Sequence, residues 1–176
     1  MLIGKRAASA AIGAVGLLLM SACTYPGPNP PEFGYNTTGS GDIVIAYPLC
    51  PGYTVSGASV YVRADSDGGN FDFRTLWQAV GPASKAAESG LFTVGTSASF
   101  QTVKLPLKGD LPNGFYVEVG ETFQGREADG RDGWIDLKHL TSAHLKSGEF
   151  MTSKGKVMTR DQISAQLTCS STSSTG

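Results

Sequence analysis

The sequence is short of charge, histidine and cysteine, and each shortage argues against a class of function. Only 16% of the 176 residues are charged, and 14 Lys and Arg against 15 Asp and Glu give a net charge of −1. We expect no nucleic acid partner, because nucleic-acid-binding proteins need clustered Lys and Arg. Two histidines, three cysteines and no CxxC pair provide no ligand cluster for a zinc or redox cofactor, so no cofactor is expected. A Gly-x-Ser-x-Gly motif is also absent, and we predict that the protein is not an enzyme.

No apolar run in the sequence is long enough for a transmembrane helix, which needs about 20 residues. A shorter uncharged run, from Ala7 to Met20, follows Lys5 and Arg6. A positive start, roughly 7–15 apolar residues and then small residues are the layout of a secretory signal. The sequence therefore predicts a signal peptide over residues 1–22 and an exported protein.

The end of this run, Leu19-Met20-Ser21-Ala22-Cys23, resembles the lipobox of bacterial lipoproteins, in which leucine is more usual at the position of Met20. In that family the signal is cleaved before the cysteine, and acyl chains such as palmitate are attached to its thiol and its new amino group. The resemblance implies lipid attachment at Cys23 and anchoring to the bacterial cell membrane or envelope. The alternative is an ordinary cleaved signal that has a cysteine nearby.

The composition divides the exported chain into a tether, one domain and a tail. Residues 24–42 contain four of the nine prolines together with Gly, Asn and Ser, which is typical of an extended linker. We therefore assign residues 23–42 to a lipidated tether and residues 43–169 to a single domain. The Ser- and Thr-rich segment 170–176 is expected to be a disordered tail.

The two remaining cysteines, Cys50 and Cys169, form an even pair in the oxidising compartment that export implies. We predict a disulfide between them, which would close nearly the whole domain into one loop. In the chain-entropy model, closing such a loop stabilises the folded state by roughly 4–5 kcal/mol. The alternative is two buried free thiols.

Short segments of β-branched or alternating residues, separated by turn residues, favour an all-β domain. Residues 58–63 and 115–119 alternate between apolar and polar side chains, and Asn113-Gly114 is a strong hairpin-turn signal. About seven such short strands predict a single immunoglobulin-like β-sandwich. Residues 111–119 also resemble the late-strand segment of immunoglobulin-like modules, although the chain lacks their Cys…Trp…Cys spacing.

Two further segments carry helical signals. Residues 71–80 fit either a helix or a strand, and their aromatic content favours the strand. The segment from Thr159 to Gln162 has the form of a capping box, and Ile163 and Leu167 follow it four residues apart. We therefore predict a short C-terminal helix that delivers Cys169 to Cys50.

The acidic segment from Asp65 to Asp72 contains the candidate metal ligands. Asp65, Asp67, Asn70 and Asp72 are four oxygen-bearing side chains close together, and Ca²⁺ takes about 6–8 oxygen ligands. The segment lacks EF-hand spacing, and Asp, Asn and Gly all favour turns, so a solvated hairpin loop is the favoured interpretation and no metal is expected. A second acidic stretch, 127–136, is interpreted as an exposed turn before a strand, for which residues 134–137 are the candidate.

Exposed aromatic side chains offer the best indication of binding. Tyr61 and Tyr116 alternate with the valines of their segments, which predicts that both face solvent on a sheet. Tyrosine combines a large apolar ring with a polar tip and is enriched at binding surfaces. We treat the two residues as a candidate binding patch, with isolated surface tyrosines as the alternative.

Together these features predict a membrane-anchored bacterial envelope lipoprotein that acts as a non-enzymatic binding or structural module. Its expected partners are the membrane, through the lipid, and an envelope protein or cell-wall polymer. One alternative is a solute- or calcium-binding lipoprotein. The other alternative is an envelope hydrolase. Its only support is the compartment and short serine motifs that are expected by chance, such as Ser153-Lys154-Gly155-Lys156.

The intact mass of the protein extracted from its host's membranes tests the anchor and the disulfide together. We expect a species that begins at Cys23, is heavier by a diacylglyceryl group plus any N-acyl group, and is lighter by two hydrogens. A soluble species without lipid would contradict the anchor.

Overall fold

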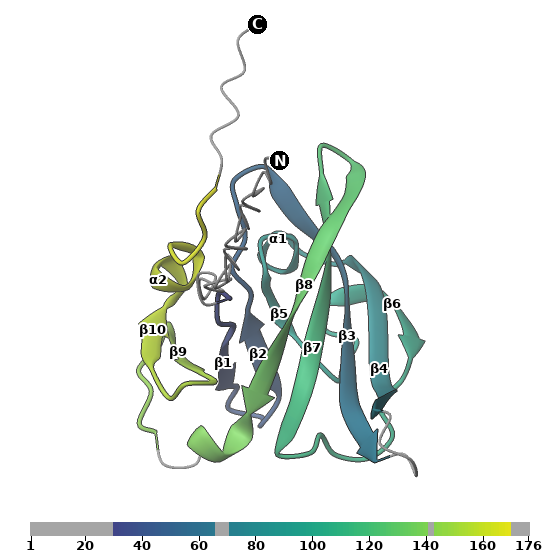
Figure 1. The fold of residues 1–176 in the computed structure, drawn as a ribbon, viewed down its shortest axis with the longest axis vertical. Helices are drawn as coiled ribbons and strands as arrows, with labels where there is room; N and C mark the ends of the chain where they lie inside the picture. The colour runs from purple at the N-terminus through teal and green to yellow at the C-terminus, as the bar shows by residue number, and fades with distance from the viewer. Residues whose placement is uncertain (1–29, 66–70, 141–142, 170–176) are drawn as a thin grey trace, which may run out of the picture.

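The computed structural model describes residues 30–65, 71–140 and 143–169, which form two antiparallel β-sheets in a sandwich (Figure 1). The all-β sandwich predicted from the sequence is therefore confirmed. The described strands number ten instead of about seven, and the three that were not predicted cover residues 34–37, 149–152 and 157–159. No described helix is long and apolar enough to cross a membrane.

The first sheet, called the short sheet, has the strand order β10-β9-β1-β2-β5. Its strands are β1 (Gly34–Thr37), β2 (Ile43–Ala46), β5 (Leu91–Thr93), β9 (Glu149–Thr152) and β10 (Val157–Thr159). All neighbouring pairs are antiparallel, and β1 lies between β2 and β9. The sheet thus joins the beginning of the described chain to a segment near its end.

The position of β1 corrects the predicted boundary between tether and domain. The composition of residues 23–42 predicted a linker, yet β1 lies within this range and is an inner strand of the short sheet. Phe33 and Tyr35 are 2% and 0% exposed, and the Tyr35 hydroxyl donates hydrogen bonds to the carbonyls of Asp136 and Thr152. The domain therefore begins before β1 and not at residue 43, because buried rings and long-range pairing outweigh the proline-rich composition.

The second sheet, called the long sheet, has the strand order β6-β4-β3-β7-β8. Its strands are β3 (Tyr53–Asp65), β4 (Phe71–Pro82), β6 (Phe100–Leu105), β7 (Gly114–Phe123) and β8 (Arg126–Asp136). The strand predicted over residues 71–80 is confirmed by β4. The strand candidate at 134–137 is confirmed by the end of β8, whereas the exposed turn predicted before it is wrong, because this Asp- and Gly-rich segment also pairs along β7.

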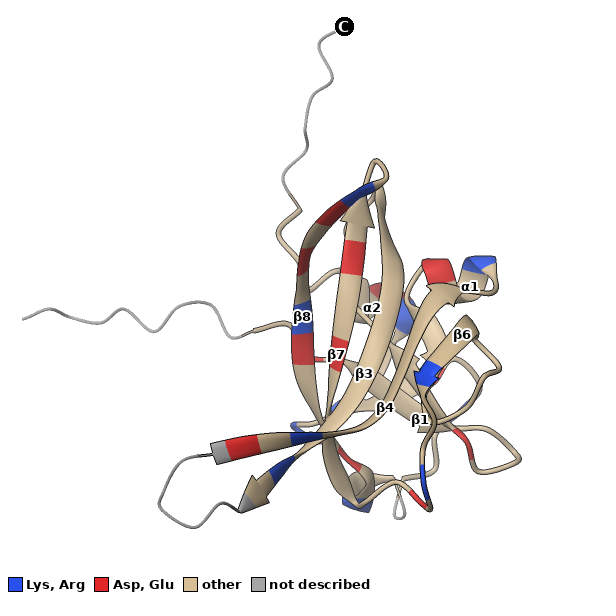
Figure 2. Cartoon of the chain, turned by 90° about the vertical axis from the view of Figure 1, so that its right-hand side faces the viewer, with Lys and Arg blue, Asp and Glu red and all other residues tan. Residues whose placement is uncertain are grey.

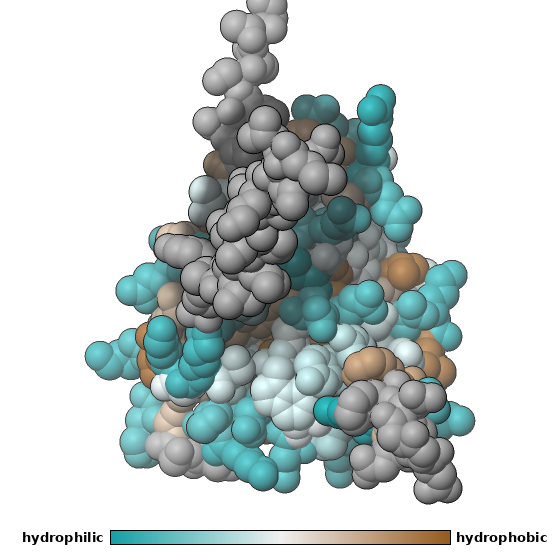
Figure 3. All heavy atoms as spheres, in the orientation of Figure 1, coloured by the Kyte–Doolittle hydropathy of each residue, from teal (hydrophilic) through white to brown (hydrophobic). Residues whose placement is uncertain are grey.

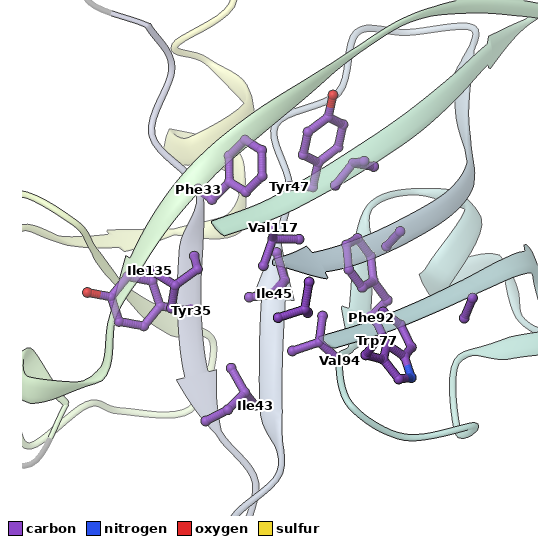
Figure 4. Packing of buried hydrophobic residues seen from close by; sticks show 14 of the residues in the cluster. Phe33, Tyr35, Ile43, Ile45, Tyr47, Trp77, Phe92, Val94, Val117 and Ile135 are labelled. Atoms are coloured by element: carbon purple, nitrogen blue, oxygen red, sulfur yellow. The ribbon is translucent and has the colours of Figure 1, made fainter. Parts of the chain in front are cut away.

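The core lies between the two sheets and is rich in aromatic side chains (Figure 4). Alternation along β3, β7 and β8 turns Val60, Val117 and Ile135 inward, and each is 0% exposed. The largest fully buried side chains are Trp77, Tyr35, Tyr47, Phe33, Phe92 and Phe115. On the face drawn in Figure 3 the coloured residues are mainly hydrophilic, and the hydrophobic ones form small, scattered patches.

The helical segments are α1 (Lys85–Glu88), the 3-10 turn η1 (Leu137–His139) and α2 (Arg160–Ser164). The capping box of α2 is confirmed, with the Thr159 hydroxyl accepting from the Gln162 backbone and the Gln162 side chain accepting from the Thr159 backbone. Beyond α2 the chain reaches Cys169, which forms the predicted disulfide with Cys50 at a Cα–Cα distance of 5.6 Å.

The packing of α2 on the short sheet generates a stability prediction with a matched control. A Cβ atom added at Gly34 of β1 would overlap Ile163 and lie 2.7 Å from Phe150 Cβ, so Gly34→Ala should lower the free energy of unfolding by about 1–3 kcal/mol. Gly39 has nothing within 4 Å of an added Cβ, and Gly39→Ala should leave stability nearly unchanged. Urea denaturation measures both, and equal stabilities would contradict a domain that includes β1.

Candidate binding surface

Four aromatic side chains from four neighbouring strands form a continuous row on the outer face of the long sheet. The aromatic row consists of Phe73 of β4, Tyr61 of β3, Tyr116 of β7 and Trp134 of β8. The pairing register places Tyr61 opposite Tyr116, and Tyr116 opposite Trp134. The structure thus brings the two tyrosines of the predicted patch together and adds two residues that the sequence analysis did not select.

The rings of the aromatic row contact one another along its whole length. Tyr61 and Tyr116 are stacked, with centroids 5.2 Å apart and planes at 8°. Phe73 packs edge to face on Tyr61 at 5.3 Å, and Trp134 contacts Tyr116 at 4.9 Å. The two outer members remain the most open, because Phe73 is 60% and Trp134 is 41% exposed. Exposed aromatic side chains gathered in this way are typical of an interaction surface.

Phe73 joins the row because of an irregularity that the sequence pattern conceals. Simple alternation in β4 would put Phe73, Thr75 and Trp77 on one face. The register shifts at Leu76, so that Val60 pairs with Trp77 while the next residue of β3 pairs with Thr75. Trp77 is therefore buried in the core, whereas Phe73 lies on the outer face.

Trp134 lies over a glycine on the neighbouring strand. A Cβ atom at Gly114 would lie 2.5 Å from the indole of Trp134, so the indole occupies the space that a side chain would fill. The alternation of Gly130, Asp132 and Trp134 was the available signal that the strand predicted at 134–137 begins earlier. It was overlooked because Asp and Gly are also the commonest turn residues.

A row of carboxylates runs beside the aromatic row. Glu118 of β7 and Asp132 of β8 are direct pairing partners one step along the same outer face, and both are exposed. Figure 2 shows acidic residues concentrated on β7 and β8. The Tyr61 hydroxyl donates a hydrogen bond to Asp132 Oδ2 at 2.9 Å. Burial, this hydrogen bond and the nearby carboxylates raise the pKa of Tyr61, so its hydroxyl stays a donor at neutral pH.

Glycines and bulges hollow the outer face beyond the carboxylates. Gly57 of β3 pairs with Gly120 of β7, and Gly130 of β8 lies close to the backbone of β7 at Val119. Register shifts interrupt the pairing at Ser56 of β3 and near Gly120 of β7, and bulges of this kind bend a sheet. The result is a groove of about 1170 Å³, and Tyr61, Phe73 and the carboxylates are among the residues that line it.

A buried charged cluster fixes the strands from beneath this groove. Glu121 is 3% exposed and accepts hydrogen bonds from the Tyr47 hydroxyl and, at 2.7 Å, from Arg131 Nη2. The same Arg131 nitrogen donates to the Pro48 carbonyl at 2.8 Å, and its guanidinium lies 5.0 Å from the centre of the Tyr47 ring. Burial and Glu121 raise the pKa of Tyr47, which keeps its hydroxyl protonated. The cluster ties β7 and β8 to the segment after β2.

The other predicted site residues lie outside the aromatic row or outside the described residues. Asp65 ends β3 and Asp72 lies near the start of β4, whereas Asp67, Asn70 and Cys23 are not among the described residues. Within the described part of the chain, no group of three or more His, Cys, Asp or Glu residues could hold a metal ion. Ser153 lies in the turn between β9 and β10, where the Gly155 N–H donates to the Thr152 carbonyl.

Comparison with known proteins does not assign this surface. No protein-family model, curated protein or solved structure matches the chain.

Glu121 and Glu118 lie three residues apart on β7 and provide a matched test of the buried cluster. Glu121→Ala leaves Arg131 without its carboxylate, and we expect a loss of about 2–4 kcal/mol in the free energy of unfolding. Glu118→Ala removes an exposed carboxylate and should change stability by less than about 0.5 kcal/mol. Similar denaturation midpoints for the two variants would show that the cluster does not fix β7 and β8.

Proposed function

We propose that the chain is an exported protein held at the bacterial envelope by a lipid on Cys23, and that its β-sandwich binds a partner through the outer face of the long sheet. The binding role rests on one observation, the exposure of the aromatic row beside a groove of about 1170 Å³. Folded proteins bury most large apolar side chains, so a contiguous exposed row favours an interaction surface. The module acts by binding and carries out no reaction.

The shape of the surface favours a macromolecular partner over a small solute. All residues that line the groove come from β3, β4, β7 and β8. The groove is therefore bounded by one sheet and is open on the side that faces away from it. Small-molecule sites enclose most of their ligand, commonly about 70–90% of its surface. The aromatic row crosses four strands, and three spacings of about 4.8 Å give it a length of about 14 Å. An extended part of an envelope protein or of a cell-wall polymer fits such a surface.

The lipid anchor is supported by the sequence. Leu19-Met20-Ser21-Ala22-Cys23 follows an uncharged run with a basic start and resembles the lipobox of bacterial lipoproteins. The disulfide between Cys50 and Cys169 agrees with export, because disulfides persist in oxidising compartments. Pairing of these two cysteines leaves Cys23 as the one cysteine of the sequence available for acylation.

Site-specific photocrosslinking in intact cells tests the proposed surface. A photoreactive phenylalanine analogue placed at Phe73 or at Trp134 should capture the partner, because these side chains are 60% and 41% exposed at the two ends of the aromatic row. We expect a discrete adduct from both positions, detected as a shift in mass on a denaturing gel.

The matched control is the same analogue at Val157 of β10, which is 48% exposed but lies in the short sheet. We expect no adduct from this position. Capture at position 157 without capture at 73 or 134 would place the interaction elsewhere and overturn the proposed surface. Absence of adducts from all three positions would also count against it.

A further inference from the structure

The arrangement of the carboxylates beside the aromatic row destabilises the protein when no partner is bound. Glu118 and Asp132 are directly opposed on β7 and β8, and like charges in this arrangement destabilise a sheet. The Tyr61 hydroxyl donates to Asp132, whereas the Glu118 carboxylate forms no ion pair with any described residue. A cation placed between the two carboxylates would remove this repulsion.

The groove does not supply that cation itself. Four acidic residues line it, namely Glu118, Glu127, Asp129 and Asp132, and Arg131 is its one basic residue among the described lining. Arg131 is already engaged with Glu121, the Pro48 carbonyl and the Tyr47 ring. The lining therefore presents unneutralised negative charge to whatever occupies the groove, and a complementary occupant is positively charged.

The aromatic row indicates which kind of cation fits. Tyr61 and Tyr116 stack on each other, and Phe73 packs edge to face against both rings. Trp134 contacts Tyr116 from the neighbouring strand. The facing sides of the two tyrosines are thus occupied by each other and closed to a flat neutral sugar. The arrangement suits the long methylene stem of Lys or Arg, which packs along apolar surface while the charged end reaches a carboxylate.

From this arrangement we infer that the groove binds an extended polypeptide segment of a partner protein, with a Lys or Arg side chain held between Glu118 and Asp132 and its stem on Tyr61 and Tyr116. The inference rests on the proposed function and specifies its partner. Complementary charges across such a contact provide specificity and fix its register. A row of about 14 Å accommodates about four extended residues at about 3.3 Å each.

Binding of synthetic peptides to the full-length protein, purified from membranes in detergent, tests the inference. The probes are an octapeptide that alternates Thr with Lys and its counterpart with Glu in place of Lys. Titration calorimetry should detect the Lys peptide alone, with affinity that weakens as salt is raised. The double variant Glu118→Gln, Asp132→Asn should lose about tenfold or more in affinity. Glu88→Gln, on α1 and away from the groove, should bind as the wild type does.

A second variant separates a specific groove from general attraction to negative charge. Trp134→Ala keeps every carboxylate but shortens the aromatic row, and we expect about tenfold weaker binding of the Lys peptide. Unchanged affinity in either the double variant or Trp134→Ala would overturn the inference. Equal binding of the Glu peptide, or binding of a neutral N-acetylglucosamine oligomer in its place, would overturn it as well.

These results are distinguishable from failure of the proposed function. Adducts from positions 73 and 134 in cells, together with peptide affinity that is insensitive to Glu118 and Asp132, would retain the binding surface and reject the cationic polypeptide. Absence of adducts would reject the surface itself.

Discussion

The long sheet has to bury one face against the short sheet, and the binding surface depends on that burial. Val60, Val117 and Ile135 are fixed in the core, so their neighbours Tyr61 and Tyr116 must face outward in register. A slip by one residue would exchange the two faces, and the core would not tolerate it. The same burial that stabilises the fold therefore also aligns the aromatic row on the outer face.

Irregularities in the strand pairing explain where side chains depart from simple alternation between the two faces of the long sheet. The shift at Leu76 lets β4 contribute Trp77 to the core and Phe73 to the surface. Along β7 the alternation is unbroken, so Glu121 faces inward like Val117 and Val119, and Arg131 and Tyr47 satisfy its carboxylate. A buried carboxylate without partners would be costly, so the inward position of Glu121 requires Arg131 and Tyr47 beside it. These irregularities also bend the sheet and open the groove.

The sequence pattern predicted those elements whose structure depends on residues close together in the sequence. Alternation over 58–63 and 115–119 was sufficient for the two central strands and for the outward tyrosines, and the capping box was sufficient for α2. The strand β1 was missed because its stability comes from pairing with β9, more than a hundred residues away, while its own composition resembles a linker. Phe73 and Glu118 could not be selected in advance, since a bulge and a cross-strand register bring them beside the tyrosines.

The early start of β1 also limits how far the sandwich can move. The backbone between Cys23 and Pro30, the first described residue, spans at most about 25 Å even when fully extended. A lipid on Cys23 would therefore keep the groove close to the bilayer and restrict the domain to diffusion in two dimensions. A partner in the same leaflet would meet it at high effective concentration, whereas a partner deeper in the envelope would have to extend a segment to the membrane.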